Sequence, residues 1–308
     1  MSSVPFVSII IPTCNRTELL AACLEALVPQ IPPDGSVELL VCDDGRDFQT
    51  RDFLAHITPH HPTAQWHRGP RKGPGANRNF GVGQARGEWL VFIDDDCVPR
   101  PGYLSGYLAA FQKAGPGSRA IFAGATYRER EHDFPLLNEA AYYRGANDLP
   151  PACNFAMPRA LYLEAGGFDE RYRVSFEDIE LFARLGLTGV TPRFLCEAAA
   201  DHPSRPLPSP FTLAKRWEAR VTSTYDFGAS TVQVLWRLPR HVLMVILSRF
   251  RGRAWSRDNL RAAKAFACEF LITLWKLPGW VLHERSGPRS DFWKKQQSLG
   301  NIPRNFGL

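Results

Sequence analysis

Three consecutive aspartates at 94–96 follow a run of apolar residues and are the group in this chain best suited to chemistry. Adjacent carboxylates repel one another, and each costs free energy when it leaves water without a partner. Side chains alternate along an extended chain, so Asp94 and Asp96 project to the same side and can face one ion or ligand. We therefore expect a divalent cation here, because carboxylates are common ligands of Mg²⁺ and Mn²⁺. The alternative is a solvated acidic turn.

A second acidic group, Glu177 and Asp178, opens a pattern typical of an amphipathic helix that continues to Leu185. The helix dipole stabilises carboxylates near a helix N-terminus, so a capping role explains them without any chemistry. A carboxylate near a reacting group can instead act as a general base. Proximity to the aspartates at 94–96 would favour the second interpretation.

Strand and helix patterns alternate in the first part of the chain and predict how these groups are positioned. Apolar, partly β-branched runs indicate strands at 7–11, 37–42 and 90–93, and helical spacing indicates helices at 18–27 and 77–84. Polar clusters follow the strands at 13–16, 43–44 and 94–96. The alternation predicts an α/β fold with a mostly parallel sheet flanked by helices, whose ligands lie beyond the carboxyl ends of the strands.

Charge divides the chain into two parts. Residues 1–203 carry 19 Lys and Arg against 25 Asp and Glu, whereas residues 204–308 carry 18 against 6. A chain of 308 residues that is 44% hydrophobic can bury a sizeable core. We therefore predict an α/β domain at 1–203, which attracts cations, and a basic, aromatic-rich helical extension at 204–308, which attracts anionic surfaces or phosphates.

The seven cysteines are scattered and never form a C-x-x-C pair, which argues against a zinc site or a disulfide framework. A reducing compartment fits this usage. The chain passes from Met1 into an apolar run without the basic and long apolar regions of a signal peptide. We therefore expect a cytoplasmic protein.

Six short motifs occur in order over the predicted α/β domain: VSIIIPTCNR at 7–16, VCDDG at 41–45, GANRNFG at 75–81, FIDDD at 92–96, GGFDE at 166–170 and EDIEL at 177–181. Each is modest by itself, but the ordered set is specific. In this set the chain resembles the family 2 glycosyltransferases. The resemblance implies the GT-A fold, which is a Rossmann-like α/β architecture, and a transferase that uses a nucleotide sugar.

The resemblance also implies roles for individual residues. The nucleotide sugar would be bound by Pro12, Thr13, Asn15, Arg16, Asp43, Arg78, Asp94 and Asp95. Asp96, joined by His202, would hold Mn²⁺ or Mg²⁺, although a lone histidine is as often an ordinary polar residue. Asp178 would be the catalytic base, with Glu177 beside it to position the acceptor. Asn154 would lie near the acceptor.

Two classes of function remain open. The first is an inverting, metal-dependent glycosyltransferase, because a single base opposite the leaving group implies in-line displacement at the anomeric carbon. It would move a sugar, from UDP by expectation, to a hydroxyl of a glycan, glycolipid or polysaccharide acceptor of the cell envelope. The second is a catalytically inactive nucleotide-sugar-binding or assembly subunit of a polysaccharide-synthesis complex. Asp96 and Asp178 favour the first. A nucleotidyltransferase fits less well, because residues 12–16 are not a Gly-rich phosphate loop.

The extension at 204–308 mixes arginines with Trp, Leu and Phe after a proline-rich joint at 203–210. This mixture suits helices that lie peripherally on an anionic membrane surface. The competing interpretation is a helical cap with solvated arginines. The most apolar segment, 266–282, is interrupted by Glu269, Lys276 and Pro278, so we expect no membrane span. Nucleic acid is not an expected partner, because no nucleic-acid-binding module is recognisable.

Overall fold

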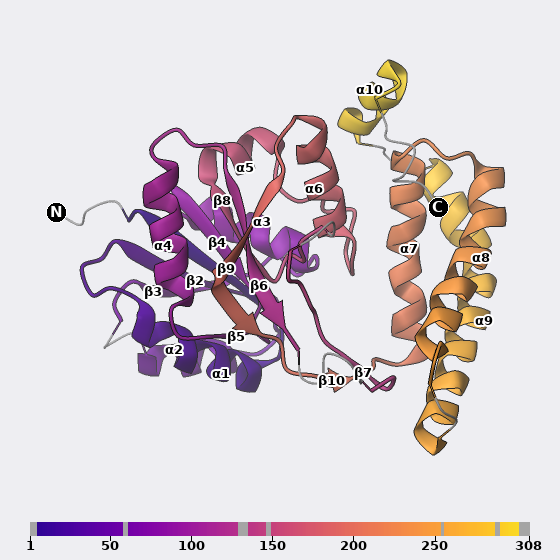
Figure 1. Cartoon of the computed structure of the whole chain (residues 1–308), viewed down its shortest axis with the longest axis horizontal. Coiled ribbons are helices and arrows are strands. Elements are labelled where there is room, and N and C mark those ends of the chain that lie inside the picture. The colour runs from indigo at the N-terminus through magenta and orange to yellow at the C-terminus, as the bar shows by residue number, and fades with distance from the viewer. Residues whose placement is uncertain are drawn as a thin grey trace. The chain divides into compact units, whose positions relative to one another are not determined.

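The computed structural model describes residues 5–57, 61–128, 135–145, 149–253, 256–286 and 290–301. The chain forms two compact units (Figure 1). We call the first the catalytic unit, which comprises residues 1–132, 140–173 and 177–204. The second, the helical unit, comprises residues 133–139, 174–176 and 205–308. The helical unit thus includes two short segments from the middle of the chain, which the predicted domain at 204–308 did not contain.

An eight-stranded mixed sheet forms the centre of the catalytic unit, with the strand order β3-β2-β1-β4-β8-β6-β9-β5. Its strands are β1 (Val7–Thr13), β2 (Val37–Asp43), β3 (Ala64–Arg68), β4 (Trp89–Ile93), β5 (Val98–Pro99), β6 (Ile121–Tyr127), β8 (Asn154–Pro158) and β9 (Pro192–Asp201). The predicted mostly parallel sheet is confirmed, since β3, β2, β1 and β4 are all parallel. Antiparallel pairs join β8 to β4 and β6, and β5 to β9.

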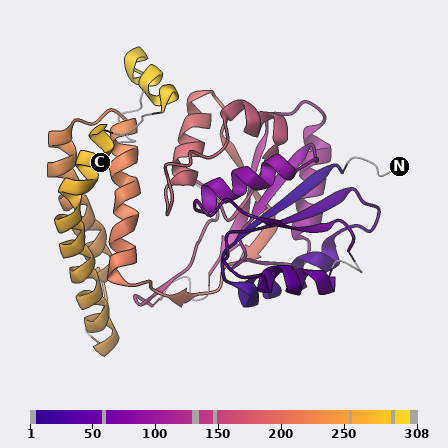
Figure 2. The same ribbon diagram turned by 180° about the vertical axis from the view of Figure 1, so that it is seen from behind.

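Helices cover both faces of this sheet (Figure 2). They are α1 (Thr17–Leu27), α2 (Gln49–Ile57), α3 (Pro74–Gln84), α4 (Tyr103–Ala114), α5 (Arg159–Ala165) and α6 (Glu177–Leu187), with a 3₁₀ turn η1 (Val28–Gln30) after α1. The predicted helix at 77–84 begins earlier, because Pro74 takes the first position of α3, where its fixed φ angle suits a helix and its missing N–H costs nothing.

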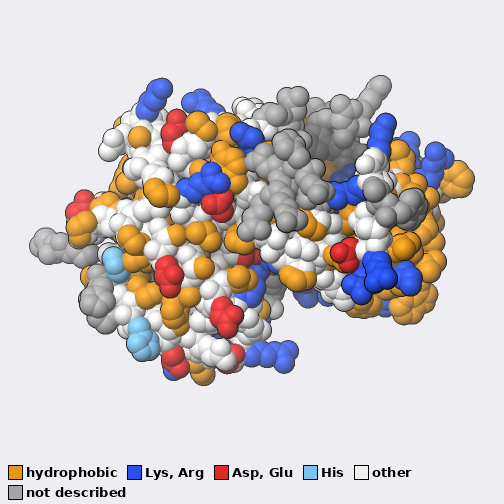
Figure 3. Space-filling view, turned by 60° about the horizontal axis from the view of Figure 1, so that its bottom comes forward, with side chains coloured by type: hydrophobic (Ala, Val, Ile, Leu, Met, Phe, Trp, Pro, Cys, Tyr) orange, Lys and Arg blue, Asp and Glu red, His pale blue; other side chains and the backbone are white. Residues whose placement is uncertain are grey.

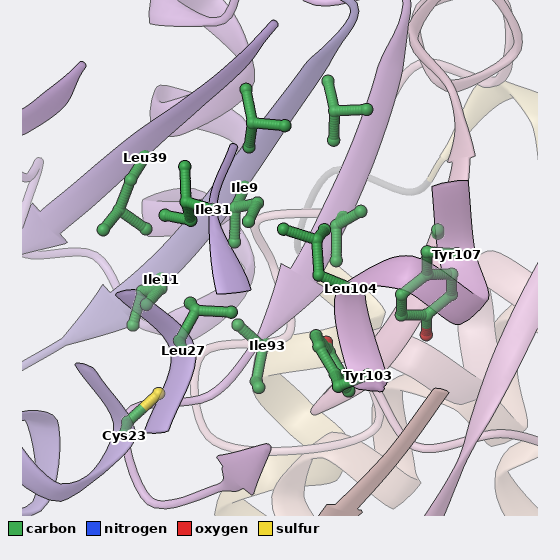
Figure 4. Close-up of a cluster of buried hydrophobic side chains, with 14 of the residues drawn as sticks. Ile9, Ile11, Cys23, Leu27, Ile31, Leu39, Ile93, Tyr103, Leu104 and Tyr107 are labelled. Carbon is green, nitrogen blue, oxygen red and sulfur yellow. The ribbon is translucent and has the colours of Figure 1, made fainter. Parts of the chain in front are cut away.

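Alternation along β1 divides the core into two layers. Ile9 and Ile11 face one layer, where they pack with side chains of α1 and α4 such as Leu27 and Tyr103 (Figure 4). Ile10 faces the other layer, together with side chains of α3, α5 and α6. Because side chains alternate with a period of two, a fully buried strand must be apolar on both faces, which explains the continuous apolar runs that precede the polar clusters.

The register of the parallel strands brings the polar clusters to one edge of the sheet. Thr13 at the end of β1 pairs with Asp43 at the end of β2. Ile10 of β1 pairs with Phe92 of β4, so the aspartates that follow β4 reach the same edge. Helix α3 lies close to these strands at Gly81, where an added Cβ would stand 2.7 Å from Ile10. This close approach brings α3 against the strands whose ends carry the polar clusters.

The helical unit consists of α7 (Pro210–Asp226), α8 (Thr231–Phe250), α9 (Arg257–Ser286) and α10 (Asp291–Leu299), with a small ladder of β7 (Asn138–Glu139) and β10 (Arg205–Pro206). Helix α9 packs against both α7 and α8. Their apolar core includes Val234, Leu238, Val242 and Ile246, which recur every fourth residue along α8. One helix segment in the described part of the chain, 257–284, is long and apolar enough to cross a membrane by length and composition alone, and a third of its most apolar window is buried.

Candidate active site

A cavity of about 440 Å³ opens beside the strand ends of the catalytic unit. Six of the residues predicted to bind a nucleotide sugar line it, namely Pro12, Thr13, Asn15, Arg16, Arg78 and Asp94. They come from the loop after β1, from α3 and from the turn after β4. The cavity therefore lies where ligands bind in open α/β sheets, beyond the carboxyl ends of parallel strands.

Two predicted nucleotide-sugar ligands, Asp43 and Asp95, lie below the cavity surface. Asp43 is buried, and its carboxylate accepts hydrogen bonds from the backbone N–H of Gly45 at 2.7 Å and from the Trp66 indole at 3.3 Å. Asp44, its neighbour, lines the cavity instead. Burial raises the pKa of Asp44, although hydrogen bonds from backbone N–H groups of Arg71 and Gly73 oppose this.

Three charged residues of the cavity lining were absent from the predicted set: Asp44, Arg46 and Arg71. Asp44 was within reach of sequence reasoning, because it follows Asp43 in the polar cluster after β2. Arg71 stands in a Gly-Pro-rich turn with a left-handed φ of 59°, and its backbone N–H donates to Asp44 at 2.9 Å. No periodic or motif signal marks such a residue, because the loop conformation alone turns it towards the cavity.

Asp95 is held by polar partners inside the unit. Its side chain is fully buried, accepts a hydrogen bond from Thr13 Oγ1 at 2.6 Å and pairs with Arg16 Nη2 at 3.0 Å. Burial raises the pKa of Asp95 to about 7, since removal from water penalises its charge, while Arg16 partly opposes this shift. Asp95 therefore stabilises the loop after β1 through its contacts with Thr13 and Arg16, below the cavity.

Asp96 and His202 meet although they are far apart in the sequence. Strand β5 pairs antiparallel with the end of β9, which brings His202 beside the turn after β4. His202 Nε2 lies 3.5 Å from Asp96 Oδ1, and both residues are buried. His202 Nδ1 donates to the Pro203 carbonyl at 3.2 Å, so the neutral imidazole carries its lone pair on Nε2, towards the carboxylate. Two electron-rich atoms that face each other fit a bound cation.

The donor set at this point suits a hard divalent cation. Asp96, Cys97 and His202 each offer a donor atom within 4.8 Å of the others. A hydrogen bond with Cys153 and burial raise the pKa of Cys97 well above its usual range, which disfavours the thiolate form that binds metals. Carboxylate and imidazole remain, and both accept Mn²⁺. Arg16 Nη1 also lies 3.1 Å from Asp96, and this ion pair partly neutralises the negative charge of the carboxylate.

Arg78 connects the cavity with the second acidic cluster. Its guanidinium donates to Asp94 at 2.5 Å and to Glu177 at 3.1 Å, and its side chain is only 3% exposed. It also lies 5.4 Å from the centre of the Phe168 ring. Asp94 and Glu177 were predicted to be functional from separate motifs, and this arginine brings them together.

Asp178 follows Glu177 at the start of α6, and backbone groups orient its carboxylate. Ile179 N–H donates to Oδ1 at 2.8 Å, and Ala152 N–H donates to Oδ2 at 3.1 Å. Burial raises the pKa of Asp178, and burial together with Asp178 raises that of Glu177, while Arg78 opposes the shift of both. A carboxylate with a raised pKa accepts a proton more readily, which suits a general base.

Asn154, which was predicted to lie near the acceptor, lies inside the sheet. Its side chain is fully buried, where Nδ2 donates to the carbonyls of Ala125 and Ala198 and Oδ1 accepts from the Tyr107 hydroxyl. This amide joins β8 to β6 and β9 inside the sheet. The prediction rested on a likeness of residues 151–157 to a family strand, and alternation turns Asn154 into the core.

The family model described as glycosyl transferase family 2 matches residues 8–165, which is about half of the chain. The chain belongs to this family. The protein is a glycosyltransferase, and the competing nucleotidyltransferase interpretation is set aside.

Two curated relatives agree with this membership of family 2. Glycosyltransferase AglE of Haloferax volcanii is 26% identical over 212 residues, which are 67% of this chain and 69% of AglE. A GalNAc(5)-diNAcBac-PP-undecaprenol beta-1,3-glucosyltransferase of Campylobacter jejuni is 31% identical over 120 residues, which are 38% of this chain and 37% of that enzyme. The family 2 chain thus spans well under two thirds of the second relative.

Two solved structures share the fold of this family 2 enzyme. Residues 1–349 of TarS from S. aureus, in complex with UDP, have a TM-score of 0.53 and 17% identity, with 96% of this chain and 91% of that chain covered. The mannosyltransferase PcManGT from Pyrobaculum calidifontis, in complex with GDP-Man and Mn²⁺, has a TM-score of 0.52 and 17% identity, with 99% and 83% covered. The predicted GT-A fold is thereby confirmed.

Proposed function

We propose that this enzyme is an inverting, metal-dependent transferase that moves a sugar from a UDP-sugar to a hydroxyl of a glycan or lipid-linked acceptor. The observation that carries the proposal is the chain of contacts Asp94–Arg78–Glu177, which ties the donor cavity to the residue before Asp178. A donor site and a base held on one rigid framework are what a single displacement requires.

Positive charge around the cavity suits a diphosphate. Arg16, Arg46 and Arg71 line it from three loops, and arginine guanidinium groups bind phosphate oxygens through paired hydrogen bonds. Asp96 and His202 would hold a divalent cation, which when bound neutralises charge on the departing diphosphate. Mn²⁺ is the ion in the structure of PcManGT, and Mn²⁺ or Mg²⁺ would suit this carboxylate and imidazole pair.

Asp178 supplies the other half of the reaction. An acceptor hydroxyl is a weak nucleophile until a base removes its proton, and such assistance contributes about 10² to 10⁴ in rate. The two backbone N–H groups that hold the carboxylate fix its orientation. One base acting opposite the leaving group gives in-line attack and inversion at the anomeric carbon. Glu177 stays paired with Arg78 and positions this base.

The relatives and structural neighbours suggest the donor base and the acceptor. UDP is present in the TarS complex, whereas PcManGT holds GDP-Man, so UDP is an assignment to test. The Campylobacter jejuni relative acts, by its name, on an undecaprenol-linked saccharide, which supports a lipid-linked acceptor. A cytoplasmic enzyme at the inner face of the membrane would meet such an acceptor.

Calorimetry of the purified protein with UDP, dTDP, GDP and CDP tests the donor site. We expect UDP to bind most tightly with Mn²⁺ present, and Asp96→Ala to abolish the effect of Mn²⁺ while a weaker, metal-independent affinity remains. Asp52→Asn, on the exposed surface of α2, is the matched control and should bind as the wild type. If folded protein binds none of the four diphosphates, the proposal is wrong.

A further inference from the structure

The helical unit carries a nine-residue pattern twice. Residues 235–243 read LWRLPRHVL, and residues 274–282 read LWKLPGWVL. The shared form is L-W-[RK]-L-P-x-x-V-L, once in α8 and once in α9. An apolar helix face needs only a periodic pattern of hydrophobic residues, so the recurrence of Trp and Pro at the same places calls for an explanation beyond packing.

Both copies expose the same positions and bury the same positions. The fourth and eighth residues lie in the core: Leu238 and Val242 are fully buried, and Leu277 and Val281 are 4% exposed. The second residues point outward: Trp236 is 68% exposed and Trp275 is 70% exposed. The leucines at both ends of each copy are exposed as well. Each helix therefore holds the bundle with one face and presents Leu, Trp and Leu with another.

The two tryptophans lie at similar heights in the helix pair. Helices α8 and α9 pack against each other and follow one another across a short connection (Figures 1 and 2). At a rise of about 1.5 Å per residue, Trp236 lies roughly 21 Å before the end of α8, and Trp275 lies roughly 27 Å after the start of α9. The exposed Leu, Trp and Leu of each copy therefore lie at about the same distance along the helix from the connection between α8 and α9.

Positive charge accompanies these apolar residues. Figure 3 shows Lys and Arg side chains beside the hydrophobic surface of the helices. Arg237 and Arg240 are exposed within the first copy, and Lys276 of the second lies 4.3 Å from the centre of the Trp275 ring. The sequence from 204 to 308 has 18 basic against 6 acidic residues. The same helices of a second copy would bring like charge against this surface, whereas an anionic lipid surface complements it.

We infer that the exposed faces of α8 and α9, with Trp236 and Trp275 at their centres, dock on an anionic lipid bilayer. Tryptophan prefers the boundary between headgroups and acyl chains, because its ring is apolar and its N–H is polar. The leucines enter that boundary, and the arginines contact lipid phosphates. The inference does not depend on the donor or acceptor of the reaction.

The opposite face of α9 indicates that the helix lies on the bilayer and does not cross it. Glu269 is buried in the helical unit and accepts a hydrogen bond from the Trp217 indole at 2.8 Å. Thr273, one turn later, is also buried and donates to the Glu269 carbonyl at 2.8 Å. Lipid around the whole helix would separate the Glu269 carboxylate from Trp217 of α7, at a high cost in free energy.

Vesicle co-sedimentation of the full chain tests the inference. We expect binding to vesicles of phosphatidylcholine with phosphatidylglycerol and much weaker binding to phosphatidylcholine alone. The double variant Trp236→Glu, Trp275→Glu should bind at least about tenfold more weakly. Leu163→Glu is the matched control. It also replaces an exposed apolar side chain by an acidic one, at a 52% exposed position of α5 in the catalytic unit, and should bind as the wild type.

A second arm separates charge from apolar insertion. Arg237→Gln with Arg240→Gln should weaken binding to the anionic vesicles roughly fivefold for each charge, because one basic residue near such a surface contributes about that factor. Carbonate at high pH should release the wild type from vesicles. If the wild type stays on the vesicles in carbonate, α9 spans the bilayer. If the wild type forms dimers that the double tryptophan variant does not form, the exposed faces bind a second copy of the chain. Either result, or folded wild type that ignores anionic vesicles, overturns the inference.

Discussion

The two units differ in where charged and large apolar side chains lie. In the catalytic unit, charged side chains lie inside and meet each other, as Arg78 does with Asp94 and Glu177. In the helical unit, arginines such as Arg237 and Arg240 are exposed, and large apolar residues such as Trp236 and Trp275 are exposed on the same helices. The first arrangement holds charge out of water for chemistry. The second offers an apolar surface to a partner.

The largest expected effect is on catalysis. Asp178→Asn removes the carboxylate that we propose as the base for the acceptor proton, so we expect transfer to fall by about 10² to 10⁴. Binding of the nucleotide should stay close to that of the wild type. Turnover assays with a UDP-sugar and a lipid-linked or glycan acceptor, together with calorimetry, measure the two quantities.

Asp52→Asn again serves as the surface control and should keep full activity. Unchanged transfer by Asp178→Asn would exclude this residue as the base. Loss of nucleotide binding along with transfer would instead show that Asp178 supports the cavity.

The next effect is on the stability of the catalytic unit. Arg78→Met leaves the carboxylates of Asp94 and Glu177 without their buried partner, which costs about 3–5 kcal/mol in the free energy of unfolding. Arg51→Met breaks the exposed pair with Asp52 and should cost no more than about 1 kcal/mol. Chemical denaturation of both variants measures the difference. Equal losses would contradict the role of Arg78 as a buried bridge.

Within the helical unit, buried and exposed residues of the same repeated pattern should differ in their effect on the free energy of unfolding. Leu238→Ala opens a cavity in the core, and we expect a loss of about 2–5 kcal/mol. Trp236→Ala changes an exposed residue and should alter the free energy of unfolding by about 0.5 kcal/mol or less. Thermal or urea unfolding checks this pair. A large loss for Trp236→Ala would show that its ring packs within the protein and is unavailable to lipid.

The smallest expected effect is a shift in pH dependence. Asp178 must be ionised to accept a proton, and its pKa is raised by burial, so kcat/KM should fall on the acid side at a pH above the ordinary carboxyl value of about 4. Glu177→Gln removes a neighbouring negative charge, which lowers the pKa of Asp178 and moves this acid limb to lower pH. A limb that moves to higher pH would contradict the assignment.

Sequence reasoning worked best where a local pattern decides the structure. Apolar runs predicted β1, β2 and β4, and the polar clusters after them predicted where the cavity would lie. It worked less well where neighbours decide a side chain's surroundings. Asp43, Asp44 and Asn154 all occur in polar or motif segments, yet only Asp44 faces the cavity.

The sequence by itself determined the family, the alternation of strands and helices that includes β1, α1, β2, α3 and β4, and the residue types at these strand ends, because periodicity and motif order are local properties of the chain. Only the tertiary structure decided that Arg78 joins Asp94 to Glu177, that β5 and β9 bring His202 to Asp96, and that Trp236 and Trp275 point outward while Leu238 and Leu277 point inward. Contacts between distant segments depend on packing and register, which no local pattern records.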